Sequence, residues 1–565
     1  MDSGRVTLAL GRMPRNALPA THWAAGPWCF AGQEDVFPQW DTAFVFAPEP
    51  LADRMLQARA CAEAKGLAAY VLPRMAQRLC DHASDLPSAY WETLLLPPVI
   101  AVARQIVERW WRVRSLVQAW GKERLHVALL PTDCVMGFAT GQDFVLYGAL
   151  GHDWNHWLLS RLLETVFPPA WSKEYLPPVV REYARPVSAL GRVRALVRNM
   201  TLRLPFPPLK GMSCTQALRY SLALMHRSRG ADMSTPLQAH AADVGLPLET
   251  LPIFLWALPH DVAALRHPAK LRRDPLGPRV RVASVCAYED AAYRQELAIW
   301  RGRGNRLMFV QHGGNYGQAR IVCDSDLVEY SQHAFGTWGW TRHGQCRGNF
   351  LPVPYPQLAK AHDQQGPRRT ADALLFLGAE MPTFGYRLES LPTPLQNLDY
   401  RRDKARFLAA LPAELLHKSV YRPYFPVPGT LQDAEWLLRR FPQVRRADGP
   451  LDRHLAQCRL LILDHNGTTL LEAMAANRPV LAFWRREHWP LVEEGEMLLD
   501  ILARAGIWLP EPSLAAAKAS EVWEHPWQWW ASDEVQQARR TYCASQAMLV
   551  PGSPDPYWVQ LLRRL

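Results

Sequence analysis

The sequence lacks any apolar run of the roughly 18 uncharged residues that a membrane-spanning helix requires. Its first stretch, MDSGRVTLALGRMPR, also lacks the basic region, apolar core and small-residue cleavage site that together mark a secretion signal. The sequence therefore favours neither an integral membrane protein nor a secreted one. We expect a soluble protein of the cytoplasm.

The cysteines give no sign of a metal centre or a disulfide framework. Ten of them are scattered between Cys29 and Cys543, with no CxxC pair and no Cys/His cluster at zinc spacing. Asp324-Ser325-Asp326 has the spacing of a DxD metal motif, but no strand pattern flanks it. Scattered cysteines in a large cytosolic chain are generally reduced and buried. The sequence predicts no metal site and no bound cofactor.

No RNP-type, zinc-finger or helix-turn-helix signature occurs, so nucleic acid is not an expected partner. Positive charge, in contrast, is abundant: the formal net charge is +11 at pH 7, carried mostly by arginine. Such an excess favours anionic partners, among them nucleotides, phosphosugars and anionic lipid headgroups. The 23 tryptophans either stack on sugars or fill the core.

A chain of 565 residues is too long for one hydrophobic core, so several domains are expected. Residues 6–10 and 124–131 read as strands, and residues 51–79 and 90–120 carry apolar side chains at helical spacing. From residue 278 onward, strands and helices alternate, which predicts parallel sheets covered by helices.

The polar segment at 362–372 is the best candidate for a linker. We therefore predict an α/β protein with two lobes facing a cleft. The expected divisions are an acceptor-side lobe with helical insertions over 1–365, a nucleotide-binding lobe over 366–526, and helices over 527–565 that pack back across the lobes.

The stretch LLILDHNGTTLLEAMAANRPVLAFW (460–484) predicts a buried strand, a polar turn, a helix and a second strand. Ligands of open α/β sheets bind beyond the carboxyl ends of strands, and a helix N-terminus offers free N–H donors to phosphate. Thr468 and Thr469 would open that helix, and Glu472 lies one turn further on, within reach of a ribose hydroxyl. The alternative is a capped helix, with Thr as the cap and Glu472 as a solvated charge.

A second motif is FVQHGGNYGQ (309–318), in which a histidine and two glycines end a predicted strand. His312 could act as a general base or contact a phosphate, since imidazole titrates near neutral pH. Gly313 and Gly314 would expose backbone amides beside it. The alternative is a structural histidine followed by glycines that permit a tight turn.

A third set consists of carboxylates among aromatic residues, Glu92 in YWE and Asp153 in GHDWNHW. Burial raises the pKa of a carboxyl group, and glycosyl chemistry uses paired carboxylates as acid, base or nucleophile. Alternatively, Asp153 caps its own helix and Glu92 pairs with Arg109 or Arg112.

Two arginines complete the set of candidates. Arg422 directly follows a predicted strand, and Arg387 lies in MPTFGYRLES. The planar guanidinium suits phosphate or carboxylate, although either arginine could pair with a structural acid instead.

The segment from Asp464 to the strand after Pro479 resembles the nucleotide-sugar-binding segment of GT-B glycosyltransferases, which carries an acidic residue, seven residues, a Glu, a helix and a Pro-containing return. The resemblance implies that Glu472 binds the donor ribose. It also implies that Asp464 acts near the sugar or its phosphate, with Asn466 and Gly467 in the same turn. One departure is Asn477-Arg478, where that family has Gly before the Pro.

The His-Gly pair is similar to one in CDP-glycerol-type polymer phosphotransferases of GT-B fold, which implies that His312 faces the cleft. Taken in order, the blocks GPWCF, YWETLL, HDWNHWLLS, QHGGNYG…SQHAFGTWGW, PTFGYRLES and LDHNGTTLLEAMAANRPVLAFW resemble a bacterial transferase family of surface-polysaccharide synthesis over about residues 20–510. The sequence departs from that pattern at 324–329. The resemblance implies a GT-B fold of two Rossmann-like lobes and a transferase activity.

A more distant similarity is to transferases that use CMP-activated 2-keto sugar acids such as Kdo, where Ser/Thr and a nearby acid surround the CMP. In the retaining version an Asp of the first lobe is the nucleophile, which would be Asp153. We therefore expect a metal-independent glycosyltransferase that moves a sugar from a nucleotide-activated donor to a cell-surface glycan or a lipid-linked lipopolysaccharide acceptor, with peripheral association at the inner membrane as a further option. The alternatives are a CDP-polyol-type phosphotransferase and a catalytically inactive nucleotide-binding scaffold.

Overall fold

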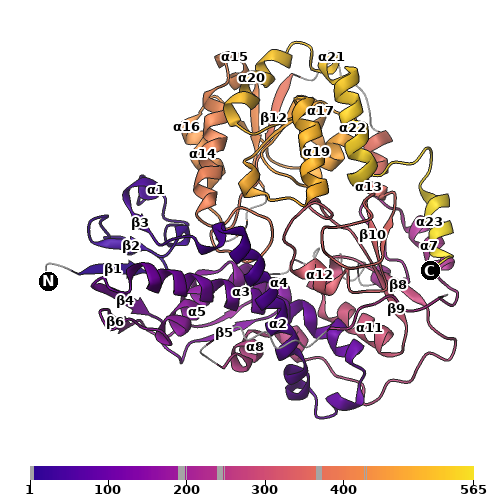
Figure 1. Ribbon diagram of the computed structural model, residues 1–565, viewed down its shortest axis with the longest axis horizontal. Coiled ribbons are helices and arrows are strands. Elements are labelled where there is room, and N and C mark those ends of the chain that lie inside the picture. The colour runs from indigo at the N-terminus through magenta and orange to yellow at the C-terminus, as the bar shows by residue number, and fades with distance from the viewer. Residues whose placement is uncertain are drawn as a thin grey trace.

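The computed structural model describes residues 5–186, 188, 198, 200–228, 230–237, 246, 249–363, 372–424, 427 and 429–565. In these residues three larger sheets and one two-stranded sheet form, and every pair of neighbouring strands is parallel (Figure 1). The predicted α/β class with parallel sheets is therefore confirmed. Most of the predicted linker, and the predicted division at residue 365, lie outside the described residues.

The N-terminal sheet has five strands in the order β3-β2-β1-β4-β6. Its members are β1 (Val6–Ala9), β2 (His22–Ala24), β3 (Val45–Phe46), β4 (Leu125–Leu129) and β6 (Ser172–Tyr175). The sequence predicts only β1 and β4. The others have two to four residues, too few for an alternating pattern to emerge.

Long helices join this sheet to the next. Helix α2 (Arg54–Leu79) begins where the Asp53 side chain accepts hydrogen bonds from the backbone N–H groups of Met55 and Leu56. Helix α3 (Ser88–Trp120) packs on α2, on α5 (His152–Glu164) and on α11 (Ala291–Gly302). Because α3 contacts helices of both sheets, it fixes their relative positions.

The second sheet has four strands in the order β11-β10-β9-β8. Its members are β8 (Val280–Ala283), β9 (Arg306–Val310), β10 (Ala334–Thr337) and β11 (Phe350–Pro352). The predicted strand–helix–strand unit after residue 278 is confirmed, because β8 pairs with β9 in parallel and α11 lies between them in the chain. The span 1–365 thus contains two separate larger sheets, where one continuous lobe with helical insertions is predicted.

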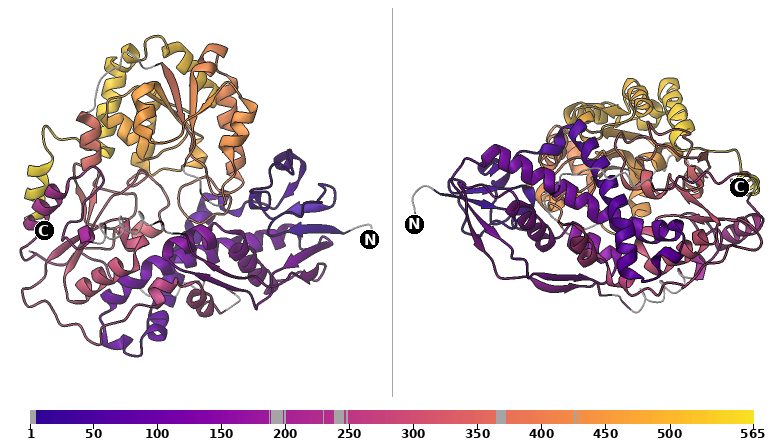
Figure 2. Two further views of the ribbon diagram at one scale, coloured as in Figure 1. Left: turned by 180° about the vertical axis from the view of Figure 1, so that it is seen from behind. Right: turned by 60° about the horizontal axis from the view of Figure 1, so that its bottom comes forward.

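The third sheet has six strands in the order β14-β13-β12-β15-β16-β17 and lies above the other two (Figure 2). Its members are β12 (Ala373–Leu377), β13 (Ser419–Arg422), β14 (Arg445–Arg446), β15 (Cys458–Leu463), β16 (Val480–Phe483) and β17 (Trp508–Leu509). Leu460 and Ile462 of β15 pack into one core, and Leu461 and Leu463 pack into the other. Helices therefore bury both faces of the sheet, as a continuous apolar run of this kind indicates.

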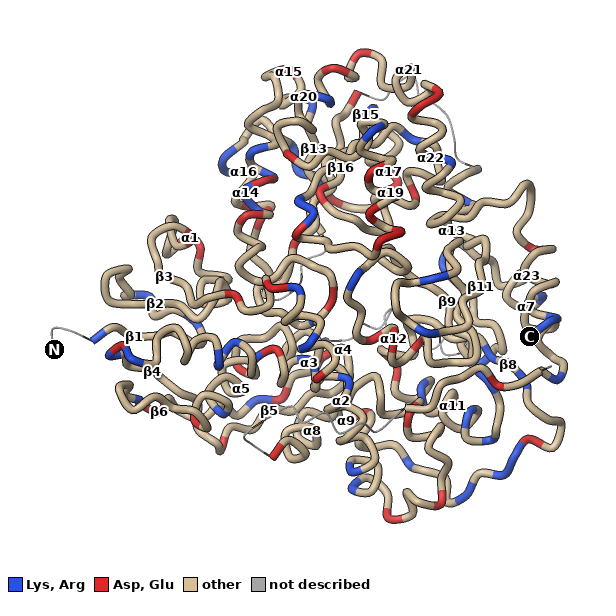
Figure 3. Tube along the Cα trace, in the orientation of Figure 1, with Lys and Arg blue, Asp and Glu red and all other residues tan. Residues whose placement is uncertain are grey.

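The C-terminal helices return to the second sheet. Helix α22 (Asp533–Gln546) lies beside α18 (Thr468–Ala475) of the third sheet, and its Tyr542 hydroxyl accepts a hydrogen bond from Gln318 Nε2 at 3.3 Å. Helix α23 (Asp555–Leu562) packs on α7 (Cys214–Ala223), and Trp558 Nε1 donates to the Pro354 carbonyl at 2.8 Å. Lysine and arginine are spread over all parts of the chain rather than gathered in one segment (Figure 3).

Candidate active site

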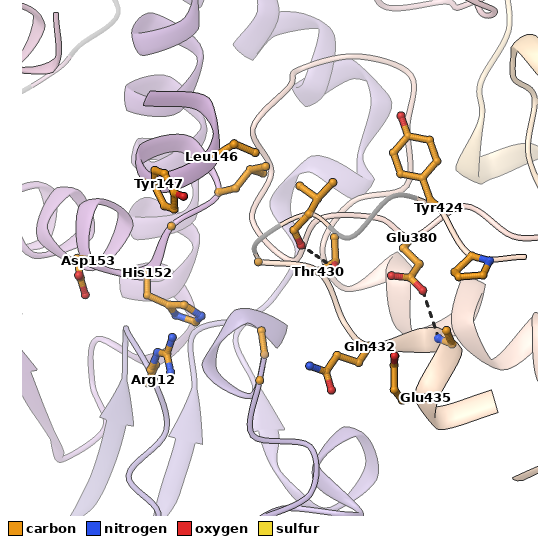
Figure 4. Close-up of a pocket in the computed structure, with 18 of the residues that line it drawn as sticks. Arg12, Leu146, Tyr147, His152, Asp153, Glu380, Tyr424, Thr430, Gln432 and Glu435 are labelled. Atoms are coloured by element: carbon orange, nitrogen blue, oxygen red, sulfur yellow. Dashed lines mark hydrogen bonds between the residues drawn. The ribbon is translucent and has the colours of Figure 1, made fainter. Parts of the chain in front are cut away.

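A cleft of about 700 Å³ separates the N-terminal sheet from the third sheet. We call it the interlobe cleft. One wall contains residues that follow β1 and precede or open α5, and the other contains residues that follow β12 and β13 or end β14 (Figure 4). The polar side chains along it are Arg12, Tyr147, His152, Asp153, Arg181, Tyr183, Glu380, Tyr424, Thr430, Gln432, Glu435 and Arg446. Carboxyl ends of parallel strands thus face the cleft from the third sheet, the usual place for a ligand in such folds.

Asp153 lies in this cleft, in the first turn of α5. Gly151, not Asp153, is the N-cap of that helix, so the capping alternative for Asp153 is wrong. Its carboxylate instead accepts a hydrogen bond of 2.6 Å from the Tyr183 hydroxyl, and Arg181 Nη1 lies 3.5 Å from the same oxygen. The Tyr183 hydroxyl and Arg181 thus hold the Asp153 carboxylate in place at the cleft wall.

Glu380 is a cleft residue that the sequence analysis misses. It follows β12 directly and accepts a hydrogen bond of 3.2 Å from the backbone N–H of Ala434. Burial, with the charge of Asp433 in addition, raises the pKa of this carboxyl to about 7. A group with such a pKa can both give and take a proton at neutral pH. The signal for it in the sequence is a carboxylate just beyond the buried strand ALLFL.

Substituting Glu380 by Gln should raise the melting temperature more at pH 8 than at pH 5. The folded chain holds the Glu380 proton more tightly than the unfolded chain, since its pKa rises from 4.5 to about 7. Stability contributed by this group therefore falls as pH rises through that window, and glutamine cannot lose a proton. Thermal unfolding at both pH values tests this, with Glu414→Gln, an exposed carboxylate, as the control. An equal gain at both pH values would contradict it.

A second group of candidates meets where β9 and β15 end. The turn after β9, residues 312–314, is called the HGG turn. The backbone N–H of Gly314 donates to Thr468 Oγ1 at 2.8 Å, which joins the HGG turn to the first residue of α18. A Cβ on Gly314 would lie 2.5 Å from the Gly467 carbonyl carbon and 2.6 Å from the Thr468 nitrogen, so only glycine permits this approach. The structure therefore brings together two motifs that are far apart in the sequence.

His312 is held by a cluster of tyrosines around a buried acid. Its Nε2 lies 2.7 Å from the Tyr316 hydroxyl and 3.3 Å from Glu329 Oε1, and the Tyr288 hydroxyl donates to the same oxygen at 2.8 Å. Glu329 is 1% exposed. Burial, with the charge of Glu329 in addition, raises the pKa values of Tyr288 and Tyr316, so both phenols stay protonated. Sequence analysis misses Glu329, which lies in the segment where the family resemblance breaks down.

The polar turn after β15 buries two of its side chains, Asp464 and Asn466. Asp464 is fully buried, and one of its oxygens accepts from the backbone N–H of Ala379 at 3.0 Å and lies 2.9 Å from His465 Nδ1. Asn466 is also buried and donates to Gln318 at 3.3 Å.

The N-cap residue of α18 is Gly467, and no side chain caps the helix. The alternative in which Thr caps this helix is therefore wrong. Thr469 is half-buried, and Glu472 lies 3.3 Å from the exposed Lys210 ammonium group.

The two arginines lie on different elements: Arg422 ends β13, and Arg387 lies on the loop that follows β12. Arg422 Nη1 donates to the Gly449 carbonyl at 2.7 Å. Arg387 Nη1 lies 3.7 Å from Glu389 Oε2. The pKa of Arg387 is raised above its ordinary value by Tyr386, and the negative charges of Glu389 and Asp324 and the phenol of Tyr316 add to this. The loop that leaves β12 thus runs from Glu380 in the interlobe cleft to Arg387 near the His312 cluster.

The structure does not bring Glu92 and Asp153 together. Glu92, on α3, lines a small separate cavity with Arg294 and Phe309, and burial raises its pKa. The predicted alternative partners of Glu92 are engaged elsewhere, because Arg109 and Arg112 both bind Glu108.

Among the described residues, no group of three or more His, Cys, Asp or Glu side chains could hold a metal ion. In the same part of the chain, no helix is long and apolar enough to cross a membrane.

Residues 6–562 match the family described as LIC12162 family transferase. The chain belongs to the LIC12162 family. It is therefore a transferase, as the resemblance implies. No curated protein matches this LIC12162 family transferase significantly.

Two solved structures are similar to the LIC12162 family chain at low identity. One is WaaG, a glycosyltransferase involved in lipopolysaccharide biosynthesis, at 15% identity and TM-score 0.25, covering 81% of this chain and 95% of WaaG. The other is a mutant O-GlcNAc transferase from Thermobaculum terrenum, at 12% identity and TM-score 0.28, covering 88% of this chain and 82% of that one. At such TM-scores the likeness carries no argument about the site.

Proposed function

We propose that this LIC12162 family transferase is a glycosyltransferase of the GT-B type. It would move a sugar from a nucleotide-activated donor to a glycan or lipid-linked saccharide acceptor. The observation that supports this proposal best is the hydrogen bond between Gly314 and Thr468, because it joins the turn that carries His312 to the first residue of α18.

The donor nucleotide would lie at this contact. The Thr468 hydroxyl already accepts from Gly314, so its own hydrogen is free to donate to a phosphate oxygen. The first N–H groups of α18 have no side-chain cap, so they would be available to the same phosphate. Glu472 is one turn further on, and its partner Lys210 is an exposed side chain that a ribose hydroxyl could replace. Arg387, near the HGG turn, would offset the phosphate charge.

The acceptor would enter the interlobe cleft, where proton transfer is available. Glu380 has the pKa of a neutral-pH acid or base, and the Asp153 carboxylate lies in the same cleft. If the donor is a CMP-activated 2-keto sugar acid, Asp153 is the candidate nucleophile, and an Asp153→Asn chain would lose transfer. An Asp153→Asn chain with full activity would remove Asp153 from the mechanism.

Calorimetry with CMP, UDP, GDP and CDP tests the proposal first. One nucleotide should bind, and Glu472→Gln should weaken that binding about 10-fold or more, as the loss of a charge-assisted hydrogen bond predicts. Glu494→Gln is the matched control, because Glu494 also faces an exposed cation, Arg342, at 3.6 Å but lies on α19 (Glu493–Arg504). Binding of none of the four nucleotides would contradict the proposal.

Analysis of the transferred group then separates the three activities. Release of a free nucleotide with a new glycosidic bond supports a glycosyltransferase. Transfer of a polyol phosphate would instead make the protein a CDP-polyol-type phosphotransferase. A scaffold would bind nucleotide without turnover, and His312→Ala and Glu472→Ala would leave polysaccharide production in cells unchanged.

A further inference from the structure

One wall of the interlobe cleft carries an arginine with no counter-charge. Arg12 is exposed and lines the cleft, and its guanidinium forms no ion pair or hydrogen bond with any residue that the structure describes. The other cleft arginines differ in this respect, since Arg181 lies 3.5 Å from Asp153 and Arg446 Nη1 lies 2.8 Å from Glu435. Arg12 therefore offers five unused N–H donors to whatever enters the cleft.

The backbone on both sides of Arg12 is fixed. Trp28 Nε1 donates to the Leu10 carbonyl at 2.8 Å, and the Met13 N–H donates to the Cys29 carbonyl at 2.8 Å. Gln33 Nε2 donates to the Met13 carbonyl at 3.0 Å. These partners are buried, so the loop is held rigidly while the arginine side chain projects from it. A preorganised donor loses less entropy when a ligand binds.

His152 stands beside Arg12 on the same wall (Figure 4). Its Nδ1 is buried and has no hydrogen-bond partner among the described residues. Burial, with the positive charge of Arg12 in addition, lowers the pKa of His152 to about 4, so the ring is neutral at pH 7. A neutral ring beside an unpaired arginine can donate one N–H without adding a second repelling charge. The uncapped start of α5, at Gly151, lies at the same place.

The opposite wall carries two carboxylates. Figure 4 shows Glu380 and Glu435 across the cleft from Arg12 and His152. Glu435 is paired with Arg446, whereas Arg12 has no such partner among the described residues, so an anionic group in the cleft would be attracted to Arg12. The two walls therefore orient any ligand that has an anionic end and a hydroxyl-bearing end.

We propose that Arg12 and His152 form an oxyanion site that binds a phosphate or carboxylate group of the acceptor. This inference rests on the proposed function, in which the donor phosphates lie at the HGG turn and α18 instead. Bidentate binding by Arg12 directs the acceptor hydroxyl toward Glu380, on the other wall. The acceptor class is thus an anionic saccharide or a saccharide phosphate rather than a neutral glycan.

The test is a thermal-shift titration of the full chain with inorganic phosphate and, separately, with acetate, at constant ionic strength. Each titration is repeated with the nucleotide identified by calorimetry at saturation, which fills the donor site. Arg12→Gln should raise the half-saturating anion concentration at least about 10-fold, as expected for a lost charge-assisted bidentate contact. Arg15→Gln should not change it, since Arg15 is exposed on the same loop but outside the cleft.

A response to phosphate alone would identify a phosphate-bearing acceptor, and a response to acetate would identify a carboxylate. An Arg12→Gln chain that responds to both anions like the wild type would overturn the inference, as would a wild-type chain that responds to neither. These results are independent of the donor site. Nucleotide binding should be the same in Arg12→Gln and wild type, and a failure of the proposed function would show as no nucleotide binding in either.

Discussion

Substitution of Gly314 by alanine is expected to reduce the proposed sugar transfer by about 100-fold or more, while the same substitution at Gly313 is tolerated. A Cβ on Gly314 would meet the backbone of Gly467 and Thr468 at 2.5 and 2.6 Å, and backbone atoms cannot rotate aside. The HGG turn and α18 must then move apart. Displacement of a positioning group by about 1 Å can cost about 100-fold in rate.

Gly313 provides a matched control within the same turn. The atom nearest to a Cβ at Gly313 is Thr468 Oγ1, at 3.7 Å, which is an ordinary van der Waals contact. Steady-state transfer assays and calorimetry with the bound nucleotide should separate the two variants, and circular dichroism should show both folded. Equal activity of Gly314→Ala and Gly313→Ala would mean that the HGG turn does not need to contact α18.

The largest expected effect on stability comes from Lys404→Met, which should lower the free energy of unfolding by about 3–5 kcal/mol. Lys404 is fully buried on α14 (Gln396–Ala409). Its ammonium group donates to Asp433 Oδ2 at 2.6 Å and to the Ala379 carbonyl, and it lies 3.9 Å from Asp464 Oδ2. Methionine keeps most of the volume but leaves buried carboxylates without this cation.

Urea unfolding monitored by tryptophan fluorescence measures this change. Lys418→Met is the control, since Lys418 pairs with the exposed carboxylates of Asp372 and Glu414 and should change stability little. If the two variants had equal stability, the ion pair of Lys404 with Asp433 would stabilise the fold no more than a buried methionine does. Lys404 also holds the Ala379 carbonyl next to Glu380, so the variant should lose activity as well.

The sequence predicts most of the third sheet correctly because its signals are local. The run LLIL forms β15, and the following helix begins at Thr468, as the small polar turn indicates. The direction of Asp464 is not predictable in this way. Its inward orientation depends on Ala379, a residue 85 positions away that the parallel pairing of β12 and β15 brings close.

The candidate site shows the same division between local and long-range information. His312 and Thr468 are each recognisable from a strand that ends in a polar turn, and the structure places their turns in contact. Glu380 follows a buried strand in the sequence, but its raised pKa and its place in a cleft depend on residues far along the chain. Arg12 is not recognisable, because what distinguishes it is its place in the cleft and its lack of a partner among the described residues. Asp153 and Glu92 share an aromatic, apolar sequence environment, yet they lie in different cavities. The roles of all these residues in catalysis stay predictions.

A crystal structure of the chain with the nucleotide that calorimetry identifies would test the central claim most directly. We predict phosphate density beside the contact between Gly314 and Thr468, within hydrogen-bond distance of the Thr468 hydroxyl, and the ribose beside Glu472. A nucleotide bound elsewhere, with the contact between Gly314 and Thr468 unchanged and no phosphate near it, would contradict the proposed donor site.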